Sequence, residues 1–277
     1  MNVWFPEQES YLIHVTPNNV SRHFTESYIH KSSEFEGYTP NIPPMPQWWV
    51  SEINKIKQQI NNGTYKKRVL YHDIRFSGDN PSNFIKNSEG EGRFLVQLDE
   101  DRLLYGNSPE CVINKVNDTV SIEVLGGTGL NLTDKFGELY PKYKNEHDII
   151  VEDLLRRNPS LQWVKKYQIK DVGYTKHVRS ILRFDTEKSL EQIVEGVYPN
   201  YAIDSDGITD WWGSLIGYHN HTLNQTKLYL CIRCGIFDIE SKTHTVRSGV
   251  GITLDSDPQE EWLEVHQKLG WLYPKKN

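Results

Sequence analysis

The sequence has few cysteines and no long apolar stretch, and both shortages exclude whole classes of protein. Cys111, Cys231 and Cys234 are the only cysteines among 277 residues, and so small and odd a number provides no disulfide framework. No stretch approaches the ~20 apolar residues that a membrane-spanning helix needs. The N-terminus MNVWFPEQES has neither a basic start nor an apolar core, so we expect no signal peptide, no membrane association and a cytoplasmic location.

Basic residues are also fewer than acidic ones. Lys and Arg total 31 against 37 Asp and Glu, which gives a formal charge of −6. This balance argues against nucleic acid as the main partner, and an anionic small substrate would need local cations or a metal. Eight Trp and 12% aromatic residues indicate a packed fold. The length suits one large domain or two small ones.

Helical periodicity begins abruptly near residue 47. Residues 1–46 show no regular pattern and end in a proline-rich stretch that should run extended. Beyond it, Ile53, Ile56 and Ile60 form one helical stripe, and Gly63 is a natural helix stop. We therefore expect an irregular segment over 1–46 and a folded domain over 47–277.

Strand-like stretches cluster along the rest of the chain. They cover residues 68–76, 92–129, 214–220, 226–240 and 243–254. Helical patterns cover 135–158, where Pro141 interrupts or restarts the helix, and 188–198. A last helix should begin at about Pro258, with Asp257 as its N-cap. This clustering predicts an α+β fold, with antiparallel β-sheets packed on each other and helices outside.

Acidic residues on two expected helices suggest a cation site. Glu261 and Glu264 are three apart and share one helical face. Glu146 lies on an earlier helix, and oxygen ligands from two helices suit Mg²⁺. Acidic residues on helix faces are more often solvated surface charges, so the spacing leaves both interpretations open.

Two further stretches carry groups able to move protons. The pair Lys66-Lys67 enters a strand, where burial can turn a lysine into a base. Glu110 lies where one strand gives way to the next, and a partly buried Glu can serve as a general acid. A surface lysine pair and a structural glutamate are the alternatives.

The spacing Cys231-x-x-Cys234 occurs in metal and redox sites. However, both cysteines fall inside the strand-like stretch 226–240, where alternation would place them on opposite faces. That pattern disfavours a shared metal or redox role.

These pieces occur in an order that resembles the chorismate-utilising enzymes: isochorismate synthase, salicylate synthase, anthranilate synthase component I and aminodeoxychorismate synthase. The resemblance covers roughly residues 48–272. The matching motifs are INNGTYKKRVL, LLYGNSPE, VLGGTG, KNEHDIIVEDLLRRN, TKHVRSILRF, WWGSLIGY, LYLCIRCG and SGVGITLDSDPQEEWLEVHQK. It implies the chorismate-binding fold in a shortened, N-terminally truncated form, and a protein partner that completes the fold is one consequence we consider.

The resemblance also implies roles for individual residues. Lys67 matches the base of the water-using members, and Glu110 matches the general acid that helps the C4 hydroxyl to leave. Glu146, Glu261 and Glu264 match the family's magnesium ligands. Substrate-binding positions are matched by His177, Arg233, Gly249, Gly251, Ala202, Trp212, Gly127, Thr128 and Lys268.

Two positions indicate which of the family's reactions the resemblance implies. Adding water at C2 of chorismate needs a base, and Lys67 stands where ammonia-using members carry glutamine. Ala202 falls where isochorismate synthases have alanine and pyruvate-eliminating members have threonine. The resemblance thus implies a Mg²⁺-dependent isochorismate synthase in menaquinone, siderophore or salicylate-type metabolism. Elimination of pyruvate as in salicylate synthases, and a non-catalytic or substrate-shifted homologue, stay open as alternatives.

Overall fold

The computed structural model describes residues 3–4, 13–15, 42–64, 66–82, 85, 92–172, 175–197, 212–220 and 222–272. The chain forms two compact units. Unit 1 comprises residues 1–7, 21–109 and 231–277, and unit 2 comprises residues 8–20 and 110–230. Within the described part of the chain, no helix is both long and apolar enough to cross a membrane.

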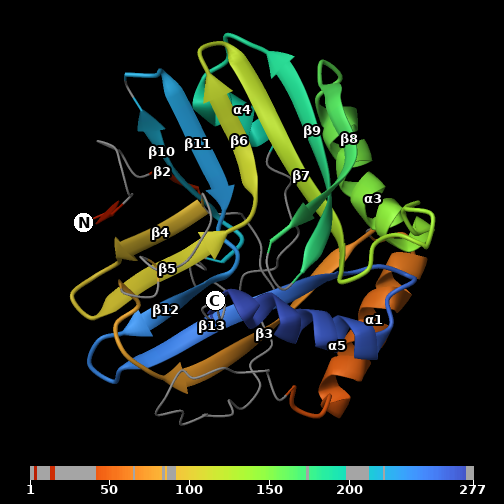
Figure 1. The fold of residues 1–277 in the computed structure, drawn as a ribbon, viewed down its shortest axis with the longest axis vertical. Helices are drawn as coiled ribbons and strands as arrows, with labels where there is room; N and C mark the ends of the chain where they lie inside the picture. The colour runs from red at the N-terminus through yellow and green to blue at the C-terminus, as the bar shows by residue number, and fades with distance from the viewer. Residues whose placement is uncertain are drawn as a thin grey trace. The chain divides into compact units, whose positions relative to one another are not determined.

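Unit 1 contains a six-stranded antiparallel sheet (Figure 1). Its strands follow the order β1 (Val3–Trp4), β4 (Gly92–Gln97), β5 (Arg102–Ser108), β12 (Cys234–Asp238), β13 (Thr243–Ile252) and β3 (Arg68–Ser77). The pairing of β13 with β3 is continuous over ten residues. Arg247 and Asp73 are opposite each other in this register, and Arg247 donates to both carboxylate oxygens of Asp73 at 2.6 and 2.7 Å and lies over the ring of Tyr71.

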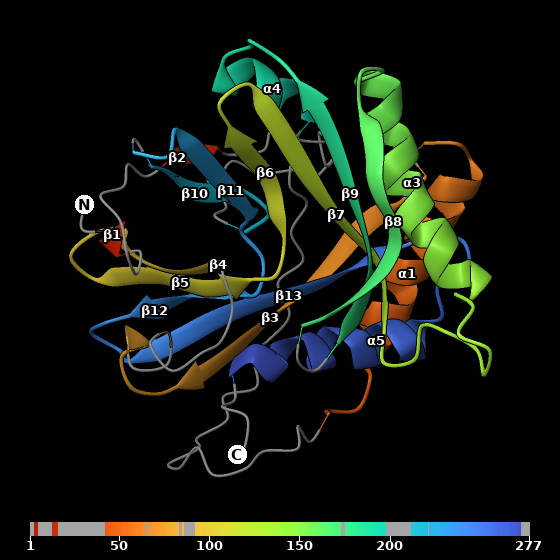
Figure 2. The same cartoon turned by 45° about the horizontal axis from the view of Figure 1, so that its top comes forward.

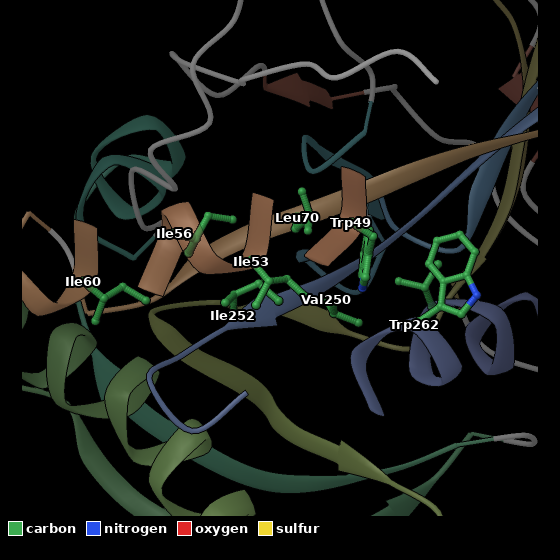
Figure 3. Close-up of a cluster of buried hydrophobic side chains, with 9 residues drawn as sticks. Trp49, Ile53, Ile56, Ile60, Leu70, Val250, Ile252 and Trp262 are labelled. Carbon is green, nitrogen blue, oxygen red and sulfur yellow. The ribbon is translucent and has the colours of Figure 1, made fainter. Parts of the chain in front are cut away.

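Helix α1 (Gln47–Asn61) covers one end of this sheet together with α5 (Pro258–Gln267). The apolar positions of α1 recur every three or four residues, so they form one stripe that faces the sheet. Figure 3 shows this stripe against β3, β13 and α5. The buried cluster consists of Trp49, Ile53, Ile56, Ile60, Leu70, Val250, Ile252, Trp262 and Val265. Each such side chain contributes roughly 1.5–3 kcal/mol through burial.

Helix α5 begins as its sequence predicts. The Asp257 carboxylate accepts from the backbone N–H groups of Gln259 and Glu260 at 2.9 and 3.0 Å, and Pro258 occupies the first turn. The indole of Trp49 donates to the Pro258 carbonyl at 3.1 Å. The start of α5 is therefore fixed both by its own cap and by α1. A 3₁₀ turn, η1 (Lys268–Leu272), follows α5.

A buried histidine anchors the other end of the unit 1 sheet. His244 lies against Phe76 and Phe237, with ring centroids 4.7 and 4.6 Å away. Its Nδ1 is 2.8 Å from the hydroxyl of Tyr105, and its Nε2 is 3.0 Å from the carbonyl of Asp79. A carbonyl only accepts, so Nε2 carries the proton and Nδ1 accepts from the tyrosine. The neutral ring satisfies both partners, and burial lowers the pKa of His244 to about 4.

Unit 2 contains a seven-stranded antiparallel sheet (Figure 2). Its strands follow the order β2 (Ile13–Val15), β10 (Leu215–Asn220), β11 (Gln225–Leu230), β6 (Cys111–Val116), β7 (Thr119–Gly129), β9 (Lys176–Asp185) and β8 (Gln162–Asp171). Helices α3 (Pro141–Arg157) and α4 (Leu190–Val197) complete the described part of this unit.

Helix α3 packs closely on β7 because β7 carries two glycines where the helix passes. A Cβ atom on Gly126 would lie 2.8 Å from the Cα of His147, and one on Gly127 would lie 2.2 Å from the Tyr143 carbonyl oxygen. Gly127 also has φ +57°, a backbone conformation that favours glycine. The Gly126-Gly127 pair therefore sets how near α3 can approach the sheet.

The expected α+β fold with antiparallel sheets is confirmed, with four α-helices in the described part of the chain. The packing of the sheets on each other and the domain division at residue 46 stay predictions. Two details differ from expectation. Helix α3 begins only at Pro141, which occupies its first turn, so residues 135–140 are not helical. The stretch 226–240 is not one strand, because β11 ends at Leu230 and β12 begins at Cys234.

Candidate functional site

Unit 1 brings the predicted base Lys67 against the predicted substrate-binding Gly251. The register of β3 with β13 places Val69 opposite Gly251, so Lys67 enters the sheet beside this glycine. A Cβ atom on Gly251 would lie 1.9 Å from Cε and 2.7 Å from Nζ of Lys67. Only glycine at position 251 leaves room for the end of the Lys67 side chain. Lys67 is half-buried, whereas Lys66 is exposed.

A second set of predicted residues meets on the same strand. The Lys268 ammonium donates to the Gly249 carbonyl at 2.8 Å and pairs with Glu264 at 2.7 Å. Gly249 and Gly251 are two apart on β13, so both lie on one face of the sheet. Lys268 therefore links Gly249 to Glu264 of α5, two residues along β13 from the Lys67–Gly251 contact, and these five residues are called the β13 group.

Arg233 adds a buried cation to this group. It lies between β11 and β12 with φ +51°, which is rare for a residue other than glycine. Its side chain is only 6% exposed. Burial lowers the pKa of Arg233 to about 10, while the nearby Glu264 charge acts in the opposite direction. The guanidinium therefore stays charged at neutral pH, as an anion-binding role requires.

The turn at Arg233 corrects the expectation for the two cysteines. Because the strand is interrupted between Leu230 and Cys234, the thiols of Cys231 and Cys234 do not point to opposite faces. They lie 3.5 Å apart and both are fully buried. They are free thiols in this structure.

The carboxylates of α5 fit a hard cation in their chemistry. Glu261 and Glu264 are one turn apart, and Glu261 is only 5% exposed. Lys268 takes one oxygen of Glu264. Across the residues that the structure describes, no three His, Cys, Asp or Glu side chains form a metal-binding group. Glu146 belongs to unit 2, so the three-carboxylate magnesium site stays a prediction.

In unit 2, the predicted general acid Glu110 is held by backbone groups. Its Oε1 atom accepts from the backbone N–H of Leu125 on β7 at 3.1 Å. Its own carbonyl accepts from the N–H of Leu230 at 3.1 Å. The side chain is 9% exposed. A buried carboxyl that a backbone amide holds in one orientation is compatible with a general-acid role.

Thr128 and His177 also meet in unit 2. The β7–β9 ladder shifts register at Gly127, and this bulge places Thr128 opposite His177. The Thr128 hydroxyl is 3.1 Å from Nδ1 of His177, and the Thr175 hydroxyl is 3.4 Å from Nε2. The imidazole therefore has a hydroxyl at each nitrogen and a fixed orientation.

For the other predicted residues, Glu146, Trp212 and Ala202, the structure gives burial or no description. Glu146 is half-buried on α3, next to the fully buried His147. Trp212 is buried just before β10. Ala202 lies outside the described residues, so its assignment stays a prediction.

Sequence reasoning missed a charged group beside Glu110. Glu123 on β7 is 8% exposed and pairs with both Lys170 and Arg179, at 2.8 and 2.5 Å. A single acidic residue within the largely apolar run of β7 was the only signal for it. Its partners come from other strands, β8 and β9, and no local pattern indicates them.

Sequence reasoning also missed two histidines, His72 and His266, that both pack against Trp262. The ring centroids of His72 and His266 are 5.3 and 4.6 Å from that of Trp262. Burial lowers the pKa of His266 to about 4, and the neighbouring His72 acts in the same direction. Both rings are therefore neutral at pH 7, and the three rings form an aromatic cluster between α5 and β3.

Comparison with known proteins gives a consistent result. The family described as chorismate binding enzyme matches residues 210–274, which include Arg233, Gly249, Gly251 and the carboxylates of α5. The isochorismate synthase MenF of Bacillus subtilis is 26% identical over 256 residues, covering 80% of this chain and 54% of the relative. The chain thus spans about half the length of that curated relative.

Two solved structures share the fold. MenF of Escherichia coli, a menaquinone-specific isochorismate synthase, aligns with a TM-score of 0.67 at 20% identity, over 82% of this chain and 60% of that one. Anthranilate synthase component I of Streptococcus pneumoniae aligns with a TM-score of 0.64 at 19% identity, over 84% of this chain and 58% of that one. The predicted resemblance is confirmed by these matches.

Proposed function

Because the chain resembles the chorismate-utilising enzymes in sequence and shares their fold, we propose that it is a Mg²⁺-dependent isochorismate synthase. The reaction adds water at C2 of chorismate and removes the C4 hydroxyl, which gives isochorismate. The observation that carries the proposal is the contact of Lys67 with Gly251, beside Gly249, Lys268 and Glu264. These residues match the family's positions, and their contacts within unit 1 support the proposal.

Two residues of the chain do the proton chemistry in this proposal. The Lys67 amine takes a proton from the attacking water, because water is too weak a nucleophile at neutral pH. The Glu110 carboxyl gives a proton to the departing C4 hydroxyl, since hydroxide is a poor leaving group. The hydrogen bond from Leu125 N–H to Oε1 orients the Glu110 carboxyl.

Other residues bind and orient the substrate. The buried cation Arg233 and the backbone from Gly249 to Gly251 take the enolpyruvyl carboxylate, and His177 lies beside the ring. Glu146, Glu261 and Glu264 would hold Mg²⁺, which when bound neutralises the ring carboxylate. Their carboxylate oxygens are the ligand type that this hard cation prefers. The activity would serve menaquinone, siderophore or salicylate-type metabolism.

Incubation of the purified protein with chorismate and Mg²⁺ tests the proposal, with products separated by HPLC. We expect isochorismate, loss of activity in EDTA and recovery on adding Mg²⁺. Lys67→Ala should abolish turnover, whereas Lys66→Ala, at the adjacent exposed lysine, should keep it.

Other outcomes would refute the proposal in different ways. Pyruvate release, measured with lactate dehydrogenase, would indicate elimination of the salicylate synthase type. Thermal stabilisation by chorismate without turnover would indicate a binding protein. Unchanged chorismate in the presence of Mg²⁺ would exclude every catalytic version.

A further inference from the structure

Strands β6 and β7 form a hairpin that opens away from its turn. The ladder pairs Val116 with Thr119, Lys115 with Val120 and Asn114 with Ser121, and among the described residues it stops there. Figures 1 and 2 both show the two strands diverging beyond this point. The backbone groups of the open end therefore need partners other than the opposite strand, since unpaired buried N–H groups are costly.

Two buried glutamates fill this opening in a reciprocal way. Glu110, just before β6, accepts through Oε1 from the N–H of Leu125 on β7 at 3.1 Å. Glu123, on β7, accepts through Oε2 from the N–H of Cys111 on β6 at 3.1 Å. Each carboxylate thus replaces one missing ladder hydrogen bond. The position of Glu110 depends on both bonds, because Cys111 is its neighbour in the chain.

Glu123 is itself fixed from the other side. The Lys170 ammonium lies 2.8 and 3.0 Å from its two oxygens, and the Arg179 Nε donates to Oε1 at 2.5 Å. Lys170 comes from β8 and Arg179 from β9. Glu123 therefore ties four strands, β6 to β9, at the place where the hairpin opens, and bonds of this kind to charged groups are the stronger ones.

We propose that Glu123 is a positioning residue that holds Glu110 in place for proton transfer. The inference rests on the proposed function, in which Glu110 protonates the leaving hydroxyl. Without the Glu123 bond to Cys111 N–H, the start of β6 keeps its pairing with β11 but loses one of its ties to β7, and the Glu110 carboxyl shifts from its place at Leu125. Proton transfer is sensitive to such shifts, because a misplacement of about 1 Å can cost about a hundredfold in rate.

Glu123→Gln is the test variant. Glutamine has one acceptor oxygen and one NH₂ group, and it carries no negative charge. If its oxygen faces the cations Lys170 and Arg179, its NH₂ group faces the Cys111 N–H, and this hydrogen bond is lost. We expect kcat to fall about ten- to a hundredfold with KM within about twofold of wild type. Hydrogen exchange at the amides of Cys111 and Leu125 should accelerate. Exchange at Leu125 reports on Glu110 directly and needs no activity.

Lys170→Met keeps the Arg179 pair and should give a smaller fall in kcat with the same change in exchange. This variant still tests the inference if Glu123→Gln folds poorly. Lys165→Met, at an exposed lysine on the same strand β8, is the matched control and should leave kcat and exchange unchanged.

Unchanged kcat and unchanged Leu125 exchange in both variants would overturn the inference, even if thermal stability fell, because Glu123 would then be structural only. Failure of the proposed function gives a different pattern. Wild type would then not turn over chorismate, or Glu110→Gln would be fully active, and the exchange experiment alone would decide whether Glu123 positions Glu110.

Discussion

Replacing Gly251 by alanine should displace Lys67 with little effect on the fold. The new Cβ would lie 1.9 Å from Lys67 Cε, whereas ordinary contact begins at 3.4 Å, so the lysine must retreat by about 1.5 Å. The atoms that move are the end of a flexible, half-buried side chain, so we expect a stability change within about 1 kcal/mol. A shift of this size at the proposed base should lower kcat by about a hundredfold, or ~2.7 kcal/mol in activation free energy.

The assay compares kcat for isochorismate formation with the melting temperature of each variant. Gly251→Ala should approach the activity of Lys67→Ala while melting close to wild type. In the double variant the two losses should not add, because both act on one side chain. The reasoning would be refuted if Gly251→Ala kept wild-type kcat while Lys67→Ala was inactive. Additive losses would equally show that the glycine acts by some other route.

Three further predictions concern stability. Asp257→Ala removes the cap of α5 and should cost about 1 kcal/mol in urea unfolding, whereas Asp257→Asn should cost less. His244 has a pKa of about 4 when folded against ~6.5 when unfolded, so its contribution is complete above pH 6.5 and is lost as pH falls toward 4, by up to about 3 kcal/mol. His244→Gln should flatten this pH slope, and equal slopes would contradict the assignment. Gly127→Ala strains a residue at φ +57° and meets the Tyr143 carbonyl, so we expect a loss of about 2–4 kcal/mol, and an unchanged melting temperature would contradict the contact.

Elements with local causes were the ones that the sequence predicted well. The stripe Ile53, Ile56 and Ile60 with the stop at Gly63, and the Asp257 cap, depend on neighbours a few residues away. The break at Arg233 was missed, because the left-handed conformation of a non-glycine residue is imposed by surrounding packing. The strand-like pattern of residues 226–240 continues on both sides of Arg233 and therefore predicts one continuous strand.

The candidate site divides in the same way. The motifs predict roles for Lys67 and Gly251 separately, but their contact follows from the register of β3 with β13, which chain neighbours do not determine. No motif indicates Glu123, since its charged partners Lys170 and Arg179 lie more than 45 residues further along the chain. Long-range charge pairs leave no periodic signal.

The hydrogen bond from Leu230 N–H to the Glu110 carbonyl has a consequence for how the protein folds. It joins the two ends of the segment 110–230 that interrupts unit 1 between β5 and β12. Once residues 110–230 have folded, the two ends of this segment are adjacent, and β5 and β12 are presented to each other as if joined by a short loop. Loop-closure entropy then opposes their pairing by about 3 kcal/mol less than in an unstructured chain. We therefore expect unit 2 to fold first and unit 1 to assemble on the ends that it holds together.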